Sequence, residues 1–97
     1  MNKMVMIAYN EAIEAEVMEI LQECGVNNYT LLPGAFGRGE ASGTHLGNDI
    51  WPGRNQILYI ACDEEKAKHI LSCIKELRKT LSKEGIKAFV LPLEEST

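Results

Sequence analysis

Two stretches with a helical hydrophobic period, set among four short apolar runs, constrain the fold of this 97-residue chain most. From Glu11 to Cys24 the apolar residues recur at the three- and four-residue spacing of a helix with one buried face, and Gly25 follows as a stop signal. The segment from about Glu64 to Glu84 repeats this pattern, with Asp63 as the expected N-cap. The sequence therefore predicts two amphipathic helices.

The apolar runs around these helices predict four strands. They lie at Met4–Tyr9, Asn28–Pro33, Gln56–Cys62 and Ile86–Leu93. With right-handed crossovers, the order β-α-β-β-α-β predicts an α+β fold of the ferredoxin-like plait class, in which both helices cover one face of a four-stranded antiparallel sheet. Because a chain of this length is too short for two cores, residues 1–97 are expected to form a single domain.

The two strands that this topology places at the centre of the sheet are apolar on both faces. Almost every residue in Met4–Tyr9 and Ile57–Cys62 is apolar, whereas a strand with one face in water normally alternates with polar residues. Two helices cover only one face, and the chain has no residues left to cover the other. The sequence therefore predicts an oligomer that buries the second sheet face at its interface.

Composition and charge exclude several classes of function. The formal net charge of −4 argues against nucleic acid as the main partner. No apolar run approaches the length of a membrane span, and the first residues are a poor match to a signal peptide. The three cysteines form no C-x-x-C motif, so we expect reduced thiols and a cytoplasmic protein, with Cys24 and Cys62 in the core and Cys73 off the apolar stripe.

Residues 34–55 form a long segment without helical or strand period, and they hold six of the eight glycines. Hairpin loops usually have two to five residues, so a loop of this length between the second and third strands is expected to be functional. The dinucleotide fingerprint fails because Ser42 stands where its third glycine should be. Arg38, between Gly37 and Gly39, nevertheless suits a bidentate contact with a phosphate.

The same segment offers no evident metal site or catalytic residue. His45 and Asp49 are four residues apart and His69 lies on the second predicted helix, but zinc requires three or four converging ligands. No nucleophile stands beside a positioned base. The sequence therefore predicts neither a catalytic residue nor a metal ligand.

Three stretches of the chain resemble the P-II signalling family. Gly34-Ala35-Phe36-Gly37-Arg38-Gly39 is similar to the G-F-G-R motif that ends the second strand of that family, before the loop known as the T-loop. The stretch from Asn55 to Glu64 resembles the strand that leads into the second helix, and the stretch from Gly85 to Glu95 resembles the G-K-I-F-V-x-P-V-E ending. The resemblance covers nearly the whole chain at matching spacing.

This resemblance implies a homotrimer with an adenine nucleotide as effector in the cleft between neighbouring subunits, and no tightly bound cofactor. It implies a non-enzymatic regulator whose T-loop, here residues 34–55, docks on a target protein such as a transporter, an enzyme or a regulator. If the target is a membrane protein, this chain would contact it without inserting into the membrane. The positions implied to bind the ligand are Gly34, Gly37, Arg38, Gly39 and Lys87. Those implied to dock on the target are Glu40, His45, Asp49 and Trp51.

Departures from the family pattern leave the effector open. Gly39 replaces the glutamine that helps to hold Mg and 2-oxoglutarate, and the phosphate-binding loop before the last strand is shortened to residues 83–87. No tyrosine lies between Gly34 and Asn55, which excludes uridylylation of the loop. A trimer similar to the CutA divalent-cation tolerance proteins, with His45, Asp49 and Trp51 near a metal-responsive cleft, is the alternative. A weak nucleotide hydrolase that uses the inter-subunit cleft is a third reading.

Overall fold

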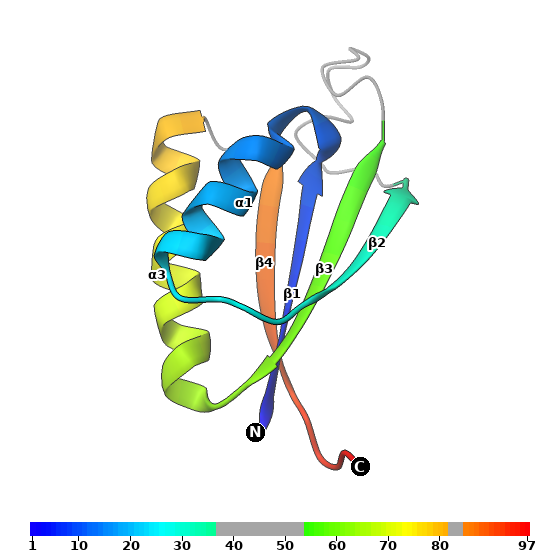
Figure 1. Ribbon diagram of the computed structural model, residues 1–97, viewed down its shortest axis with the longest axis vertical. Coiled ribbons are helices and arrows are strands. Elements are labelled where there is room, and N and C mark those ends of the chain that lie inside the picture. Colours follow the sequence, from blue (N-terminus) through cyan, green and yellow to red (C-terminus); the bar gives the residue numbers. More distant parts are fainter. Residues whose placement is uncertain (37–53, 82–84) are drawn as a thin grey trace.

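The computed structural model of the chain describes residues 1–36, 54–81 and 85–97. Its elements follow the predicted order along the chain (Figure 1). They are β1 (Lys3–Asn10), the short 3-10 helix η1 (Glu11–Ile13), α1 (Glu14–Glu23), β2 (Thr30–Ala35), β3 (Asn55–Cys62), α3 (Glu64–Leu81) and β4 (Ile86–Pro92). Within these described ranges, no helix is long and apolar enough to span a bilayer.

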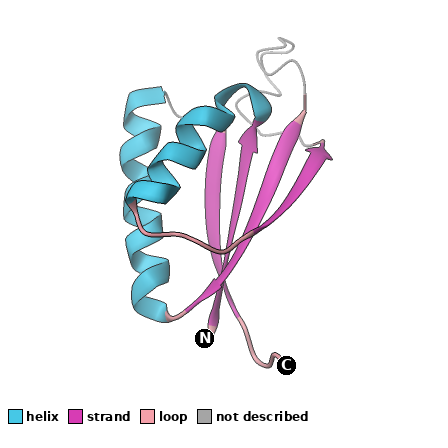
Figure 2. Cartoon of the chain, in the orientation of Figure 1, coloured by secondary structure: helices cyan, strands magenta, loops and turns pink. Residues whose placement is uncertain are grey.

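The four strands form one antiparallel sheet in the order β2-β3-β1-β4, and both helices lie on the same face of it (Figures 1 and 2). β1 is paired along most of its length with both neighbours, so that Val5 lies opposite Ile60 on one side and Val90 on the other. The predicted ferredoxin-like plait is confirmed, with β1 and β3 at the centre. This position accounts for the apolar residues on the face that packs against the helices.

Among the described residues, the start of the first helix and both ends of the second strand, predicted at Asn28–Pro33, differ from the prediction by two or more residues. The segment from Glu11 begins as a 3-10 turn, because the Asn10 side chain accepts a hydrogen bond from the Ala12 amide at 2.9 Å and so fixes the entry of the chain into the helix. β2 runs to Ala35 and includes a register shift between Leu32 and Ala35. Gly34 has a φ of 73° within this shift, a conformation that favours glycine.

The start of α3 is as predicted. The Asp63 carboxylate accepts a hydrogen bond from the Lys66 amide at 2.8 Å, which satisfies one of the free amides of the first turn. Glu64 and Glu65 follow in that turn, where negative charge complements the helix dipole.

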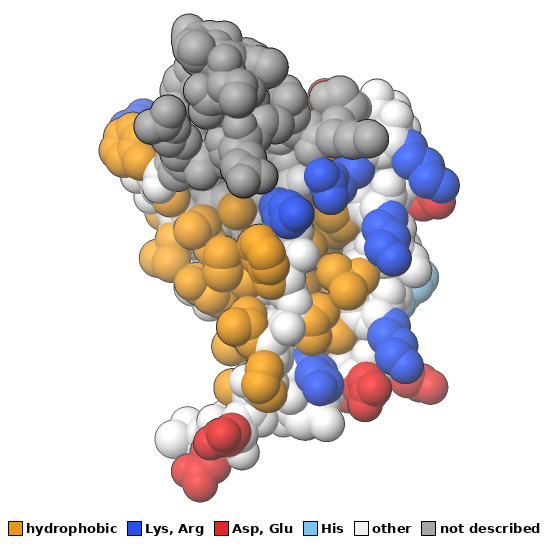
Figure 3. Space-filling model, turned by 180° about the vertical axis from the view of Figure 1, so that it is seen from behind, with side chains coloured by type: hydrophobic (Ala, Val, Ile, Leu, Met, Phe, Trp, Pro, Cys, Tyr) orange, Lys and Arg blue, Asp and Glu red, His pale blue; other side chains and the backbone are white. Residues whose placement is uncertain are grey.

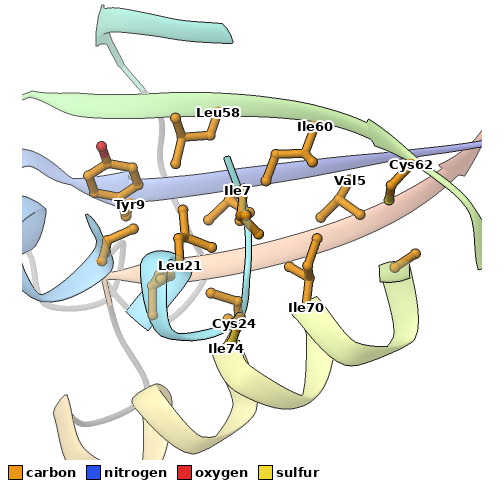
Figure 4. Packing of buried hydrophobic residues seen from close by; sticks show 14 residues of the cluster. Val5, Ile7, Tyr9, Leu21, Cys24, Leu58, Ile60, Cys62, Ile70 and Ile74 are labelled. Atoms are coloured by element: carbon orange, nitrogen blue, oxygen red, sulfur yellow. The ribbon is translucent and has the colours of Figure 1, made fainter. Parts of the chain in front are cut away.

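The core lies between the sheet and the helices (Figure 4). The inward side chains of β1 and β3 meet those of α1 and α3. The most deeply buried branched aliphatic members are Val5, Ile7, Val17, Leu21, Leu58, Ile70, Ile74 and Ile86. This cluster uses only the face of the sheet that meets the helices, so the opposite face has no covering layer among the described residues.

The prediction of three free thiols is wrong for two of the cysteines. Cys24, at the C-terminal end of α1, and Cys73, on α3, form a disulfide although 49 positions separate them in sequence. The contact arises because α1 and α3 pack side by side on the sheet, which spacing along the chain does not show. Cys62 is a free, buried cysteine, and burial raises the pKa of its thiol. Cys24 and Cys62 are core residues, as predicted.

Candidate functional site

At the end of the sheet where residues 34–55 leave and return, Arg54 is joined to η1 by two hydrogen bonds. The Glu11 amide donates to the Arg54 carbonyl at 2.9 Å, and the Arg54 amide donates to the Glu11 carboxylate at 3.4 Å. A Cβ atom at Gly34 would lie 3.9 Å from Cδ of Arg54. The two ends of the predicted T-loop are therefore fixed beside each other and beside the start of the first helix.

A part-buried carboxylate joins three elements at the same end of the sheet. The Tyr9 hydroxyl donates to Oε1 of Glu14 at 2.6 Å, and Nε2 of Gln56 donates to the same oxygen at 2.6 Å. Burial first, and then the hydrogen bond to Glu14, raise the pKa of the Tyr9 phenol well above its usual range. The phenol therefore stays protonated at neutral pH and serves as a donor that ties β1 to α1.

We expect Tyr9→Phe to lower the free energy of unfolding at neutral pH by about 1.5 kcal/mol, because a hydrogen bond to a charged acceptor is lost. Since the folded-state pKa of Tyr9 is raised, its contribution is complete below about pH 10, the unfolded value, and is lost as the pH rises further. Urea unfolding between neutral pH and strongly alkaline pH measures this. The wild type should lose stability in the alkaline range with a slope of up to about 1.4 kcal/mol per pH unit more than Tyr9→Phe does.

Tyr29→Phe is the matched control, because Tyr29 is 48% exposed and makes no contact with Glu14 among the hydrogen bonds of the described residues. Its alkaline profile should follow that of the wild type. Identical profiles for the wild type and Tyr9→Phe would contradict the assignment of Tyr9.

Asn10 is a further polar residue at this end of the sheet, and the sequence pattern did not single it out. It is 1% exposed and its Oδ1 atom caps η1. Its backbone N–H donates to the Gly85 carbonyl at 2.8 Å. Its Nδ2 group has no acceptor among the described residues. A buried donor without a partner costs about 1–3 kcal/mol, so the Asn10 side chain is a polar group buried at a cost in stability at this end of the sheet. The sequence feature that could have identified Asn10 is its position between an apolar strand and the acidic start of the first helix.

The sheet face opposite the helices is a broad apolar surface (Figure 3). Its side chains alternate with those of the core and form cross-strand rows. From the loop end these rows are Leu32, Ile57, Ala8 and Lys87, then Thr30, Tyr59, Met6 and Phe89, and then Ala61, Met4 and Leu91. We call these eleven residues the open face. Leu32, Phe89 and Leu91 are each 43–47% exposed, so the expected uncovered apolar face is present in the single chain.

Lys87 is the charged member of the open face. It lies in the row nearest the loop, it is exposed, and its Nζ atom is 5.9 Å from the centre of the Phe89 ring. The ammonium group is thus held over an apolar surface, at the edge strand next to β1. A cation in this position can bind an anion that enters along the loop end of the sheet.

The chain does not bring Gly34 and Lys87 together. Gly34 lies on β2 and Lys87 on β4, which are the two opposite edges of the sheet. Three strand spacings, about 14 Å, separate these edges. A depression lined by Met1, Cys62, Asp63, Glu65 and Lys66 lies near the other end of β3, away from both residues.

The remaining predicted site residues lie outside the described residues. These are Gly37, Arg38 and Gly39 of the ligand set and Glu40, His45, Asp49 and Trp51 of the docking set. Their roles stay predictions. The described neighbours that the structure adds are Asn10, Glu11 and Arg54, all at the same end of the sheet.

Known structures share the fold of this chain. A PII-like signaling protein from Thermus thermophilus has 24% sequence identity to this chain and a TM-score of 0.62. The match covers 95% of this chain and 86% of the Thermus protein. The PII-like protein CPII from Thiomonas intermedia K12, solved with ADP, AMP and bicarbonate, has 18% identity and a TM-score of 0.72, covering 99% and 89%. The same protein with ADP, AMP and acetate has 19% identity and a TM-score of 0.73, with the same coverage.

No curated protein matches the chain by sequence. The family model of the nitrogen regulatory protein P-II, in contrast, matches residues 2–97, which include all four strands and both helices. The fold and the three motif stretches agree with this match, and the chain belongs to the P-II family.

Proposed function

We propose that this protein is a non-enzymatic, cytoplasmic signal-transduction regulator that binds an adenine nucleotide between the subunits of a homotrimer. Residues 34–55 act as its T-loop and dock on a target protein according to the ligand bound. The observation that carries the proposal is the open face, an apolar surface with a single cation at its loop end, in a chain of the P-II family.

The open face supports the oligomer. In a monomer, Leu32, Phe89 and Leu91 would remain in water, and a contiguous apolar surface of this kind is typical of a protein interface. The trimer, with three sheets facing one another, is the assembly that the family resemblance implies. It would bury the open face of every chain.

The distribution of polar groups supports a ligand between subunits. Gly34 and Lys87 lie on opposite edges of the sheet, so a ligand that uses both must extend along the sheet end or meet the edge of a second chain. Lys87 and the predicted Arg38 would neutralise phosphate oxygens. Adenine nucleotides are the proposed class, because CPII has been solved with ADP and AMP.

The anchored loop ends support a signalling role. Glu11 and Arg54 fix where residues 34–55 end, and the pairing of Ala35 with Asn55 holds the beginning beside this end, so a ligand beside this anchor would select among arrangements of the loop. In the proposal, Glu40, His45, Asp49 and Trp51 then contact a transporter, an enzyme or a regulator. Glu14 already accepts from two donors and Tyr9 is protonated, so neither is poised to activate water.

Isothermal titration calorimetry with AMP, ADP, ATP and cyclic AMP, each with and without bicarbonate, tests this proposal. At least one adenine nucleotide should bind with micromolar affinity, and GDP should bind more weakly. The absence of binding by every adenine nucleotide would overturn the proposed effector class. Release of phosphate at a rate that scales with protein concentration would overturn the non-enzymatic role.

A further inference from the structure

Three metal-binding side chains lie together on the helix layer, away from the open face and the loop. Cys24 is at the C-terminal end of α1, and His69 and Cys73 are one turn apart on α3, so they project from the same face of that helix. The sulfur and ring nitrogen atoms all lie within 4.8 Å of one another, and Nε2 of His69 is 4.0 Å from Sγ of Cys73.

We propose that Cys24, His69 and Cys73 form a Zn²⁺ site when the disulfide is reduced. The oxidised pair has no thiolate to offer, so the same two cysteines either bind the cation or form the bond. This site is independent of the proposed nucleotide site and uses none of its residues.

The geometry fits tetrahedral zinc. Zn–S bonds of about 2.3 Å and Zn–N bonds of about 2.0 Å place neighbouring ligand atoms about 3.5–3.8 Å apart. The distance from His69 to Cys73 is already near this value. The Cα atoms of Cys24 and Cys73 are 6.7 Å apart, which allows the two sulfurs to separate by side-chain rotation once their bond is broken.

Contacts other than the disulfide also hold Cys24 in place. α1 ends in a Schellman motif, in which the Gly25 amide donates to the Gln22 carbonyl and the Val26 amide to the Leu21 carbonyl. Lys66 of α3 then donates to the carbonyl of Gly25 at 3.0 Å and contacts that of Cys24 at 3.5 Å. These bonds connect the two helices beside the cluster, so the three ligands should stay close to one another in the reduced protein.

Burial and charge also suit a cation with one open coordination position. Cys24 is buried, Cys73 is half-buried and His69 is exposed, so the site is closed on the core side and open toward solvent. A water molecule can take the fourth position. The two thiolates supply the negative charge that Zn²⁺ needs, beside the Lys66 ammonium that binds the carbonyls at the C-terminal end of α1.

The site forms by a balanced exchange of electrons and protons. A thiolate of a small thiol reductant attacks Cys73, the more exposed residue of the pair, and Cys24 leaves as a thiolate. A second reductant thiolate breaks the mixed disulfide and releases Cys73, so two electrons reduce the protein and the reductant becomes a disulfide. Zn²⁺ then binds both thiolates and neutral His69, and any thiol protons are released to water. Reducing compartments keep such pairs as thiols, which is the form that binds.

Competition between the full-length protein and a chromophoric chelator for Zn²⁺ tests the proposal, under anaerobic conditions and with a phosphine reductant. The reduced protein should bind one Zn²⁺ per chain and the oxidised protein none. His69→Ala and Cys73→Ser should each weaken binding by at least about 100-fold, more than the loss of a group that only orients a ligand typically does. Because His69 is exposed, His69→Ala should keep the circular dichroism spectrum of the wild type.

Two control variants separate this site from other thiols and histidines. Cys62→Ala removes the remaining cysteine and His45→Ala the remaining histidine, and both should bind Zn²⁺ as the wild type does. Co²⁺ in place of Zn²⁺ should give the absorption of tetrahedral thiolate coordination, and Cys73→Ser should lose it. No Zn²⁺ binding by the reduced, folded protein, or binding that His69→Ala and Cys73→Ser leave unchanged, would overturn the proposal. Loss of binding in His45→Ala would also overturn it, since it would place the metal at the loop.

Discussion

Phe89→Glu is expected to convert the proposed trimer into monomers. Phe89 lies in the middle row of the open face, opposite Met6, and is 45% exposed in the single chain. If the interface covers it, the new carboxylate must lose its hydration without gaining a partner, in every subunit of the assembly. Light scattering after size-exclusion chromatography measures the effect as a fall in mass from the trimer to the monomer.

Ala15→Glu is the matched control for this prediction. Ala15 is exposed on α1, so the substitution adds the same charge outside the open face. Its mass should equal that of the wild type. A trimer that persists in Phe89→Glu would show that the open face is not the interface.

Lys87→Ala is expected to weaken adenine nucleotide binding by about 10-fold to 100-fold, because a charge-assisted contact with phosphate is lost. Lys87→Arg should recover most of the affinity, since it keeps the charge. Calorimetric titration with ADP at two salt concentrations measures both effects, and the salt dependence should be smaller in Lys87→Ala. Light scattering should give each variant the same oligomeric mass as the wild type. This check is needed because Lys87 also lies over Phe89, which belongs to the proposed interface.

Lys68→Ala is the control for general loss of positive charge. Lys68 lies in the first half of α3, is exposed and pairs with Glu64 at 3.7 Å, at the end of the sheet opposite the loop. It should bind ADP as the wild type does. Equal affinities for the wild type and Lys87→Ala would remove Lys87 from the proposed site.

The fold could be predicted because the hydrophobic period of each helix and strand, and the order of these elements, can be read directly along the chain. The run Ile57–Cys62 lies in the central strand β3 and packs one of its two apolar faces against the helices, and Asp63 marks the start of α3 by a local hydrogen bond. The bulge at Gly34 extended β2 beyond its predicted end, because pairing with Asn55 depends on the partner strand.

Some contacts of the candidate site form only when elements far apart in the sequence pack together. The sequence alone could not predict these contacts. The carboxylate of Glu14 joins Tyr9 and Gln56 only after α1 has packed on the sheet. The pairing of Cys24 with Cys73 likewise requires α1 and α3 to lie side by side. The roles of Arg38 and the other residues between 37 and 53 rest on motif resemblance alone.

Assembly and ligand binding are coupled in the proposed function, and native mass spectrometry of the protein with ADP measures both in one experiment. We expect a trimer that takes up nucleotide, with up to one ADP per subunit, and no nucleotide on any monomer. A protein that stays monomeric across micromolar concentrations, or a trimer that takes up none of the adenine nucleotides, would contradict this coupling.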